Sequence, residues 1–173
     1  MQPSENQPKF TLEPLAKQHD RVAFSCGVIT LDQYLQRQAS QDVKKHVAVV
    51  FVLTPDGETI AGFYTLSQYA VELDVLPEEI SRKLPKYPHV PATLLGRLAV
   101  SEDFRGQRLG ERLLMDALYR SFQGSKLLAS AAVVVDAKDN SAVAFYRKYG
   151  FLGLPKVPKR LFLPMSTIED LFG

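Results

Sequence analysis

A short basic turn carries the clearest chemistry in this sequence. The turn Arg105–Gly110 (RGQRLG) follows an apolar stretch, Leu94–Val100, and apolar residues recur at helical spacing after Gly110. The turn therefore precedes a helix, where free N–H groups and the positive end of the helix dipole favour an anion. Arg105 and Arg108 add positive charge, so a pyrophosphate would fit here. A solvated surface turn has the same composition.

A second feature is a tyrosine-bearing helix near the C-terminus. A buried strand, Ala129–Asp136, leads to Asp139 and Asn140, which are expected to cap this helix. The helix carries Tyr146 and is expected to stop at Gly150, in the position of a C′ glycine. A tyrosine on such a helix commonly packs in the core, so its spacing to other residues has to decide its role.

The remaining elements alternate strands and helices. A helix is predicted over Thr30–Val43, with Thr30 as N-cap, and the segment Pro55-Asp56-Gly57 is a predicted hairpin turn. Strands are predicted at Phe10–Leu15, Val47–Leu53, Thr59–Ser67, Leu94–Val100, Ala129–Asp136 and Lys159–Pro164, the last at a sheet edge, and Ile168–Phe172 forms a hydrophobic end. The pattern predicts an α/β fold.

The segment Val71–Pro91 does not fit this alternation. Its prolines break regular structure, although Glu78–Leu84 could form a short helix. A segment of this length inside a compact domain is expected to be a substrate-facing loop or a partner surface, and a rigid surface excursion is the alternative.

Composition favours one domain over residues 1–173. The chain has 173 residues, 46% of them hydrophobic and 23% charged, which suits a single core. No apolar run approaches the ~20 residues of a membrane helix, and the N-terminal MQPSENQPKF lacks a signal-peptide core, so we expect a cytoplasmic protein. The single cysteine, Cys26, excludes an internal disulfide and is expected to be partly buried. No cysteine and histidine cluster predicts a metal site.

Basic residues are grouped in local clusters, although the net charge of the whole chain is small. The formal net charge is only +2, which by itself does not indicate nucleic-acid binding. Basic clusters without an acidic member are Lys44-Lys45-His46, Arg82-Lys83 with Lys86, Arg105 with Arg108, Arg147-Lys148, and Lys156 with Lys159-Arg160. They indicate either solvated faces or a one-sided positive surface that could meet phosphates.

The turn resembles the acyl-CoA loop of the GNAT N-acetyltransferases, whose pattern is Gln/Arg-x-x-Gly-x-Gly/Ala. One position departs from the pattern, because the central glycine is Arg108. That side chain either crowds a bound pyrophosphate or points outward and pairs with a phosphate. The segment Asp139–Phe151 resembles the second GNAT signature, Asn-x-x-Ala-x-x-x-Tyr-x-x-x-Gly-Phe, with Asp139 in place of the asparagine and with Tyr146 and Gly150 in register.

The resemblance implies a fold and a set of site residues. The fold is a single α/β domain with a mixed central sheet flanked by helices, and it binds acyl-CoA at the splay between the fourth and fifth strands. The acetyl-CoA cradle is then formed by Leu98, Ala99, Val100, Arg105, Gly106, Gln107, Arg108, Leu109 and Gly110, with Asp139 also at the cofactor. Tyr146 becomes the catalytic tyrosine, and no metal is implied.

A narrower resemblance covers nearly the whole chain. Short segments such as Phe24-x-Cys26-Gly27, Gly62–Ser67, Leu95–Val100 and Val135–Lys138 are similar to acetyltransferase toxins of the TacT and AtaT type, which belong to type II toxin–antitoxin systems. Those toxins are encoded beside a ribbon-helix-helix antitoxin, form dimers, and use acetyl-CoA to acetylate the α-amine of aminoacyl-tRNA, which halts translation. We expect the same function here.

The chemistry of acyl transfer is compatible with this expectation. The reaction needs a neutral amine, a polarised thioester carbonyl and a proton for the departing thiolate. Tyr146, with an ordinary pKa near 10, can supply the proton, and backbone N–H groups at Leu98–Val100 can serve the oxyanion. A lysine amine would need a base, whereas the α-amine of an aminoacyl ester is already largely neutral. Glu72 and Asp136 are candidate bases, but each can equally be a surface or capping carboxylate.

The substrate residues and the alternatives follow from the same reasoning. Lys44, Lys45 and Arg97 are the expected contacts to tRNA phosphates. One alternative function is acetylation of a small amine or a protein N-terminus. The other is a CoA-binding regulator without turnover, which the substitutions at Arg108 and Asp139 would suit.

Overall fold

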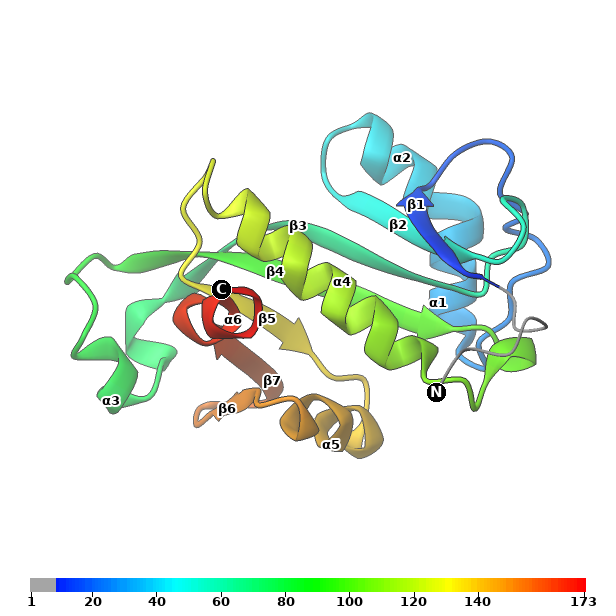
Figure 1. Ribbon diagram of the computed structural model, residues 1–173. Helices are drawn as coiled ribbons and strands as arrows, with labels where there is room; N and C mark the ends of the chain where they lie inside the picture. Colours follow the sequence, from blue (N-terminus) through cyan, green and yellow to red (C-terminus); the bar gives the residue numbers. More distant parts are fainter. Residues whose placement is uncertain (1–8) are drawn as a thin grey trace. The chain divides into compact units, whose positions relative to one another are not determined.

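A computed structural model describes residues 9–173, and Figure 1 labels their helices and strands. The signal-peptide prediction depends largely on residues 1–8, which lie outside the described residues. The strands form a seven-stranded sheet in the order β1-β2-β3-β4-β5-β7-β6. β4 and β5 pair in parallel, whereas β1 with β2, β5 with β7, and β6 with β7 pair antiparallel. The predicted mixed sheet with helices is therefore confirmed.

The bounds of the elements are as follows. The strands are β1 (Thr11–Pro14), β2 (Val49–Thr54), β3 (Gly62–Glu72), β4 (His89–Val100), β5 (Ala132–Asp136), β6 (Leu152–Leu154) and β7 (Val157–Pro164). The α-helices are α1 (Ile29–Gln33), α2 (Ala39–Lys44), α3 (Glu78–Ser81), α4 (Leu109–Gly124), α5 (Asn140–Lys148) and α6 (Met165–Phe172). A π-helix, η1 (Tyr34–Gln38), joins α1 to α2, and η2 (Leu73–Val75) and η3 (Glu102–Phe104) are short 3₁₀ helices.

The chain divides into two compact units. The first comprises the residues up to Thr65 together with Arg97–Asp116, and the second comprises Leu66–Gly96 together with Ala117–Gly173. Each unit has its own cluster of buried apolar side chains. Such clusters supply the main favourable free energy of folding, because burial removes apolar surface from water.

The core of the first unit is built around Phe63 on β3. Phe24 packs edge-on against Phe63 with ring centres 5.4 Å apart, and Tyr34 stacks on it at 6.3 Å. The predicted N-cap Thr30 is wrong, because α1 begins at Ile29 with Val28 as N-cap. The helix begins earlier because the Asp32 carboxylate accepts the N–H of Cys26 at 2.9 Å and draws the preceding chain against the first turn. Cys26 is buried, as expected.

The predicted hairpin turn is present, but the strand after it begins later than predicted. The Asp56 carboxylate accepts the N–H groups of Glu58 and Thr59 at 2.9 and 2.7 Å and also the Thr59 hydroxyl at 2.7 Å. These bonds extend the turn through Thr59, so β3 starts at Gly62. The hydroxyl bond from Thr59 and the backbone bonds lower the pKa of Asp56 to about 2.

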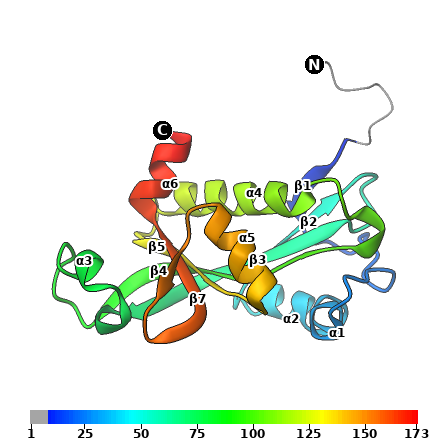
Figure 2. The same cartoon turned by 90° about the horizontal axis from the view of Figure 1, so that it is seen from below.

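The second unit contains β5, β6 and β7 together with the proline-rich segment. β7 was predicted at a sheet edge, but it pairs with both β5 and β6, so the edge belongs to β6. The sequence does not predict β6, because this strand is only three residues long. Figures 1 and 2 both place α3 beside the far end of β3 and the start of β4, and residues of η2 and α3 pack on the core of this unit.

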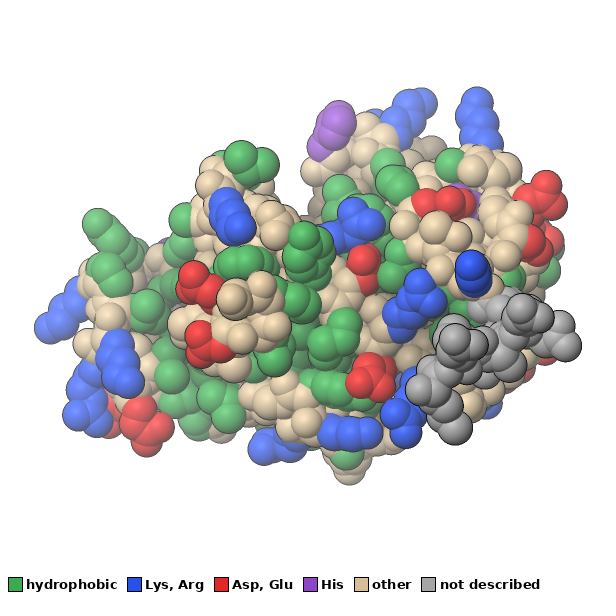
Figure 3. Space-filling view, in the orientation of Figure 1, with side chains coloured by type: hydrophobic (Ala, Val, Ile, Leu, Met, Phe, Trp, Pro, Cys, Tyr) green, Lys and Arg blue, Asp and Glu red, His purple; other side chains and the backbone are tan. Residues whose placement is uncertain are grey.

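Apolar side chains also lie exposed on the second unit. Figure 3 shows hydrophobic side chains gathered over α4 and α6, among few charges. Tyr119, Leu127 and Leu171 are exposed, and the Tyr119 ring packs edge-on against Phe172 at 5.3 Å. The face drawn in Figure 3 carries both basic and acidic side chains, so this face is not uniformly positive.

Candidate active site

The predicted phosphate turn lies between η3 and α4 in the first unit. Gly106 has a φ of 81° and Arg108 a φ of 57°, so the backbone passes through the left-handed region at both residues. The first helical bond runs from the N–H of Arg112 to the carbonyl of Arg108 at 3.3 Å. The N–H groups before Arg112 have no partner within the helix, as at any helix start, and they face the exposed turn. This geometry suits an anion.

Arg108 occupies a backbone conformation that favours glycine. A left-handed residue other than glycine costs roughly 1–2 kcal/mol, because its Cβ approaches the carbonyl oxygen. The family pattern has glycine at this position, and the φ of 57° gives a physical reason for that preference. The loop therefore keeps a glycine-type conformation although an arginine stands there, and the Arg108 side chain is exposed.

Arg105 is used differently from Arg108. Its Nη2 donates to the carbonyl of Cys26 at 2.9 Å and lies 3.7 Å from the carboxylate of Glu102. A Cβ on Gly27, whose φ is 86°, would come within 2.9 Å of the same Nη2. Arg105 thus ties the start of the turn to the loop before α1, and its guanidinium is already partly engaged.

The pairing between β4 and β5 ends before the predicted phosphate turn. The register pairs β4 with β5 at Thr93, Leu94 and Leu95 only. β4 then continues to Val100, whereas β5 ends at Asp136, the residue after the partner of Leu95. Leu98, Ala99 and Val100 thus extend past this pairing, and Ala99 is buried in the core of the first unit.

Tyr146 belongs to the second unit and is fixed by the end of its helix. The N–H of Gly150 donates to the carbonyl of Arg147 at 3.0 Å, and the N–H of Phe151 donates to the carbonyl of Tyr146 at 3.2 Å. With Gly150 at a φ of 95°, these bonds form a Schellman motif. The rings of Tyr146 and Phe151 pack 5.4 Å apart, which is the apolar contact that accompanies this motif. The Tyr-x-x-x-Gly-Phe pattern is therefore a helix cap that holds the tyrosine in place.

Burial decides the protonation state of Tyr146. Its side chain is buried, with 7% of the residue exposed, and its ring also packs edge-on against Phe145 at 5.2 Å. Burial raises the pKa of Tyr146 above its ordinary value, because the phenolate is poorly solvated there. The phenol stays protonated throughout the physiological range and can donate a proton.

Asp139 serves as the N-cap of α5. Its carboxylate accepts the N–H of Ala142 at 2.8 Å, as the sequence predicted for a capping residue. Asparagine, the residue of the family signature, caps helices equally well, so this substitution leaves the local structure intact. A direct role for Asp139 at the cofactor stays a prediction.

The residues predicted to contact tRNA fall in two environments. Lys44 and Lys45 are exposed at the end of α2. Arg97 is only partly exposed, and its guanidinium carbon lies 3.5 Å from the centre of the Tyr34 ring. Tyr34 donates to the Asp42 carboxylate at 2.8 Å, and Gln38 donates to its other oxygen at 2.9 Å. Burial, followed by the bond to Asp42, raises the pKa of Tyr34, so its ring stays neutral beneath the arginine.

The two candidate bases differ in their surroundings. Both oxygens of Asp136 accept from Arg160, at 2.7 and 3.1 Å, and Arg160 also donates to the Tyr69 hydroxyl at 2.7 Å. Asp136 is therefore engaged in a bidentate ion pair. Glu72 is exposed at the end of β3 and lines an open hollow with Arg82, Lys86 and other residues. Asp136 is therefore already paired, whereas Glu72 is open to solvent beside basic side chains.

Sequence reasoning missed the residues that position others. Tyr34 and Asp42 are eight residues apart, which is not a helical contact spacing, and Arg160 is remote from Tyr69 and Asp136 in sequence. No local pattern could have identified either set.

Among residues 9–173, no group of histidine, cysteine and carboxylate side chains could hold a metal ion. No helix in that range is long and apolar enough to span a membrane.

Comparison with known sequences identifies relatives along nearly the full chain. Residues 46–152 match the family model described as an acetyltransferase (GNAT) domain. The chain is 35% identical to a probable toxin TacT of Sinorhizobium fredii, over 95% of this chain and 96% of that protein. It is 34% identical to a tRNA-acetylating toxin of Mycobacterium tuberculosis, over 89% of this chain and 91% of that protein.

Solved structures of toxins share the fold. A tyrosine-to-phenylalanine mutant of KacT has a TM-score of 0.88 at 29% identity, covering 94% of this chain and 99% of its own. AtaT complexed with acetyl-methionyl-tRNAfMet also has a TM-score of 0.88, at 27% identity, covering 95% and 100%. AtaTR bound with AcCoA has a TM-score of 0.84 at 27% identity, covering 95% and 98%. Together with the turn before α4 and the capped tyrosine helix, these matches show that the chain belongs to the GNAT family of acetyltransferases.

Proposed function

We propose that this protein is a toxin that transfers the acetyl group of acetyl-CoA to the α-amine of aminoacyl-tRNA and so blocks translation. Two relatives that align with most of the chain carry names of such toxins, and one of them is named as tRNA-acetylating. A structural neighbour at 27% identity holds an acetylated aminoacyl-tRNA. These relatives support aminoacyl-tRNA as the substrate class, and the following roles in acetyl transfer are assigned to residues of this chain.

The turn Arg105–Gly110 would hold the pyrophosphate of acetyl-CoA through its backbone. The free N–H groups at the start of α4, beside the left-handed residues Gly106 and Arg108, would donate to phosphate oxygens. Since Arg105 is tied to Cys26 and Glu102, Arg108 is the side chain we assign to a phosphate. Acetyl-CoA supplies the activated acetyl group, and N–H groups at Leu98–Val100 would donate to its carbonyl oxygen.

Tyr146 would donate the proton to the leaving thiolate, and its environment is the observation that carries the proposal. The Schellman motif fixes its position, and burial keeps its phenol protonated. A group held neutral in this way is suited to an acid and not to a base. This assignment leaves the incoming amine without a strong base from the same residue.

An enzyme without an assigned general base is better suited to the α-amine of an aminoacyl ester than to the amine of a lysine side chain. Asp136 is held by Arg160, so it is not free to accept a proton from an amine. An ordinary lysine amine has a pKa of about 10.4 and would be charged, whereas an α-amine has a pKa of about 8, and lower as an ester. An amine that is largely neutral at cellular pH needs little deprotonation.

Lys44, Lys45 and Arg97 would contact tRNA phosphates from the first unit. Lys44 and Lys45 are exposed and free to follow the backbone, and Arg97 is pre-oriented on the Tyr34 ring. We further propose that residues 1–173 work as one N-acetyltransferase domain in the cytoplasm, where charged tRNA resides. The protein would act as a homodimer and be neutralised by a ribbon-helix-helix antitoxin, as the resemblance implies.

Labelled acetyl-CoA and total charged tRNA test the proposal directly. We expect label on the aminoacyl ester, released from tRNA by mild alkali as N-acetyl amino acid, and no label with Tyr146→Phe in the same period. Charge reversal by Lys44→Glu should lower labelling more than it lowers acetyl-CoA affinity, whereas Lys17→Glu, an exposed lysine outside the basic clusters, is the control.

Label on free amines or protein N-termini but never on the ester would replace this function with the small-amine or N-terminal enzyme. Acetyl-CoA binding without transfer to any amine would favour a regulator without turnover.

A further inference from the structure

A cavity lies within the second unit, and none of the residues assigned to acetyl transfer is among those that line it. It has a volume of about 560 Å³ and is bordered by the α3 segment, the starts of β4 and β5, β6, the end of β7 and the start of α6. This volume lies within the range of about 300–1,000 Å³ that is typical of small-molecule sites. The lining includes the first residues of β5, whereas Asp136 and Tyr146 follow from the other end of that strand.

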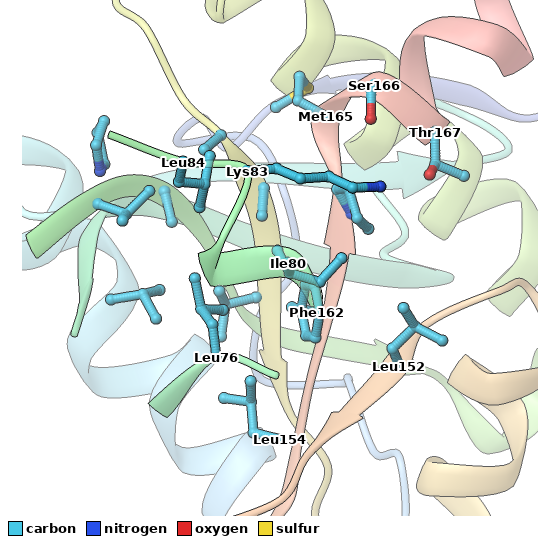
Figure 4. A pocket seen from close by; sticks show the side chains of 18 residues that line it. Leu76, Ile80, Lys83, Leu84, Leu152, Leu154, Phe162, Met165, Ser166 and Thr167 are labelled. Carbon is cyan, nitrogen blue, oxygen red and sulfur yellow. The ribbon is translucent and has the colours of Figure 1, made fainter. Parts of the chain in front are cut away.

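One end of this cavity is apolar. Leu76 and Ile80 from the α3 segment face Leu154 and Phe162 from β6 and β7, as Figure 4 shows. Leu76, Leu154 and Phe162 are themselves buried. No aspartate or glutamate is among the described residues that line the cavity.

The other end is polar and positive. In Figure 4 the amine of Lys83 extends toward Ser166 and Thr167, which begin α6 after Pro164. The N–H of Met165 is already bonded to the carbonyl of Ala131 at 2.8 Å, but those of Ser166 and Thr167 lie in the first helical turn and have no partner within the helix. Lys83, Ser166 and Thr167 are exposed, so an ammonium group, two hydroxyls and a helix start line the open end of the cavity. This set suits a carboxylate.

We propose that the cavity binds an aliphatic monocarboxylate, with its chain between Leu76 and Phe162 and its carboxylate at Lys83, Ser166 and Thr167. An apolar lining with one basic and no acidic side chain suits a ligand with an anionic head and an apolar body. A polypeptide segment fits less well, because each peptide group in the apolar end would leave an N–H and a C=O without partners. An uncharged apolar ligand would leave Lys83 unused.

Decanoate is the probe for this site, with decanol as its uncharged analogue. Calorimetry on the full chain, below the concentration at which decanoate forms micelles, should show saturable binding of one decanoate per chain and a negative heat-capacity change from apolar burial. Lys83→Ala should weaken decanoate roughly tenfold, the scale of a charge-assisted hydrogen bond, and should leave decanol unchanged. Decanoate and decanol should then bind the variant about equally.

Lys86→Ala is the matched control. Lys86 is an exposed lysine on the same segment, but it borders the hollow with Glu72 and not this cavity. Ala92→Leu should narrow the cavity and weaken binding of both probes, with thermal melting as the check that the variant folds. If Ala92→Leu does not fold, the comparison of Lys83→Ala with Lys86→Ala still tests whether decanoate binds with its carboxylate at Lys83.

Three results would overturn the proposal. One is the absence of saturable decanoate binding. Another is equal weakening by Lys83→Ala and Lys86→Ala. The last is loss of decanoate binding in saturating acetyl-CoA, which would place the probe in the acetyl transfer site.

Discussion

Arg97 rests on the face of Tyr34, with its guanidinium carbon 3.5 Å from the ring centre. The Tyr34 hydroxyl is held by Asp42, and the ring stacks on Phe63 in the core of the first unit. A cation over an aromatic face is attracted by the ring's quadrupole, and Arg97 is only partly exposed. The direction of this arginine is therefore set by a side chain far from it in sequence.

Tyr34→Phe and Tyr34→Leu should separate the two functions of this ring. Tyr34→Phe keeps the platform and loses the bond to Asp42, so we expect about 1 kcal/mol less free energy of unfolding and nearly unchanged acetylation of charged tRNA. Tyr34→Leu removes the platform, so the KM for charged tRNA should rise at unchanged acetyl-CoA affinity. Denaturant titrations and steady-state kinetics measure these quantities. Equal kinetic effects of the two variants would mean that the platform does not orient Arg97.

Tyr146→Phe should lower turnover by about 10²–10⁴, the range of positioned proton transfer. The Schellman motif uses the backbone of residue 146, and the ring contact with Phe151 survives, so folding should be retained. Single-turnover kinetics with acetyl-CoA, beside calorimetry of acetyl-CoA binding, measure the two effects. Tyr149→Phe, at the C-cap of the same helix, is the comparison, and wild-type turnover in Tyr146→Phe would remove this phenol from the mechanism.

Stability in alkali should reveal the buried tyrosines. Burial raises the pKa of Tyr146 and is the largest cause of the raised pKa of Tyr34, whereas both phenols titrate near 10 in the unfolded chain. Above pH 10 the unfolded state loses protons that the folded state keeps, so the free energy of unfolding falls as pH rises. Below pH 9 neither residue should contribute a slope. Urea titrations from pH 8 to pH 11 should show a smaller fall in Tyr146→Phe, and an unchanged fall would contradict the burial assignment.

Arg108 offers a test that separates backbone strain from phosphate binding. Arg108→Ala keeps the left-handed cost and loses the guanidinium, so acetyl-CoA binding should weaken by roughly 1.5–3 kcal/mol. Arg108→Gly relieves roughly 1–2 kcal/mol of strain, offset by about 0.4–1 kcal/mol from the freer unfolded chain, so it should be the more stable of the two. Its acetyl-CoA binding should be no tighter than that of the alanine variant. Tighter binding than wild type in Arg108→Gly would indicate that the arginine crowds the loop.

Gly150→Ala should destabilise the helix end that holds Tyr146. Gly150 has a φ of 95°, and an added Cβ would meet only Leu163 at an ordinary 3.7 Å, so the expected cost of about 1–2 kcal/mol comes from the backbone. Gly124→Ala is the matched control, since a Cβ there meets nothing within 4 Å and its φ is not positive. Thermal melts and turnover measure both variants. Equal melting temperatures would contradict the role of the cap.

The sequence predicted the local features of the site better than the contacts between remote residues. The turn before α4, the Asp139 cap and the stop at Gly150 are set by short-range chemistry, and the structure has all three. The engagement of Arg105 with Cys26 depends on residues far apart in sequence, and so could not be predicted. The same holds for the cavity at Lys83, which is assembled from several elements.

The π-helix between α1 and α2 changes the direction in which the side chains after it point around the helix axis. In a regular α-helix each residue turns about 100°, so residues eight apart point about 80° away from alignment. The wider π turn at Tyr34–Gln38 absorbs one residue and brings Asp42 back beneath the Tyr34 hydroxyl. If the same residues wound as a regular α-helix, Asp42 would point about 80° away from the Tyr34 hydroxyl, and the later residues of α2, including Lys44, would be rotated by about the same angle. Deleting one residue from the π turn would instead leave them within about 20° of their present direction, because seven α-helical residues make nearly two full turns. The π turn thus sets the direction in which the basic end of this helix points.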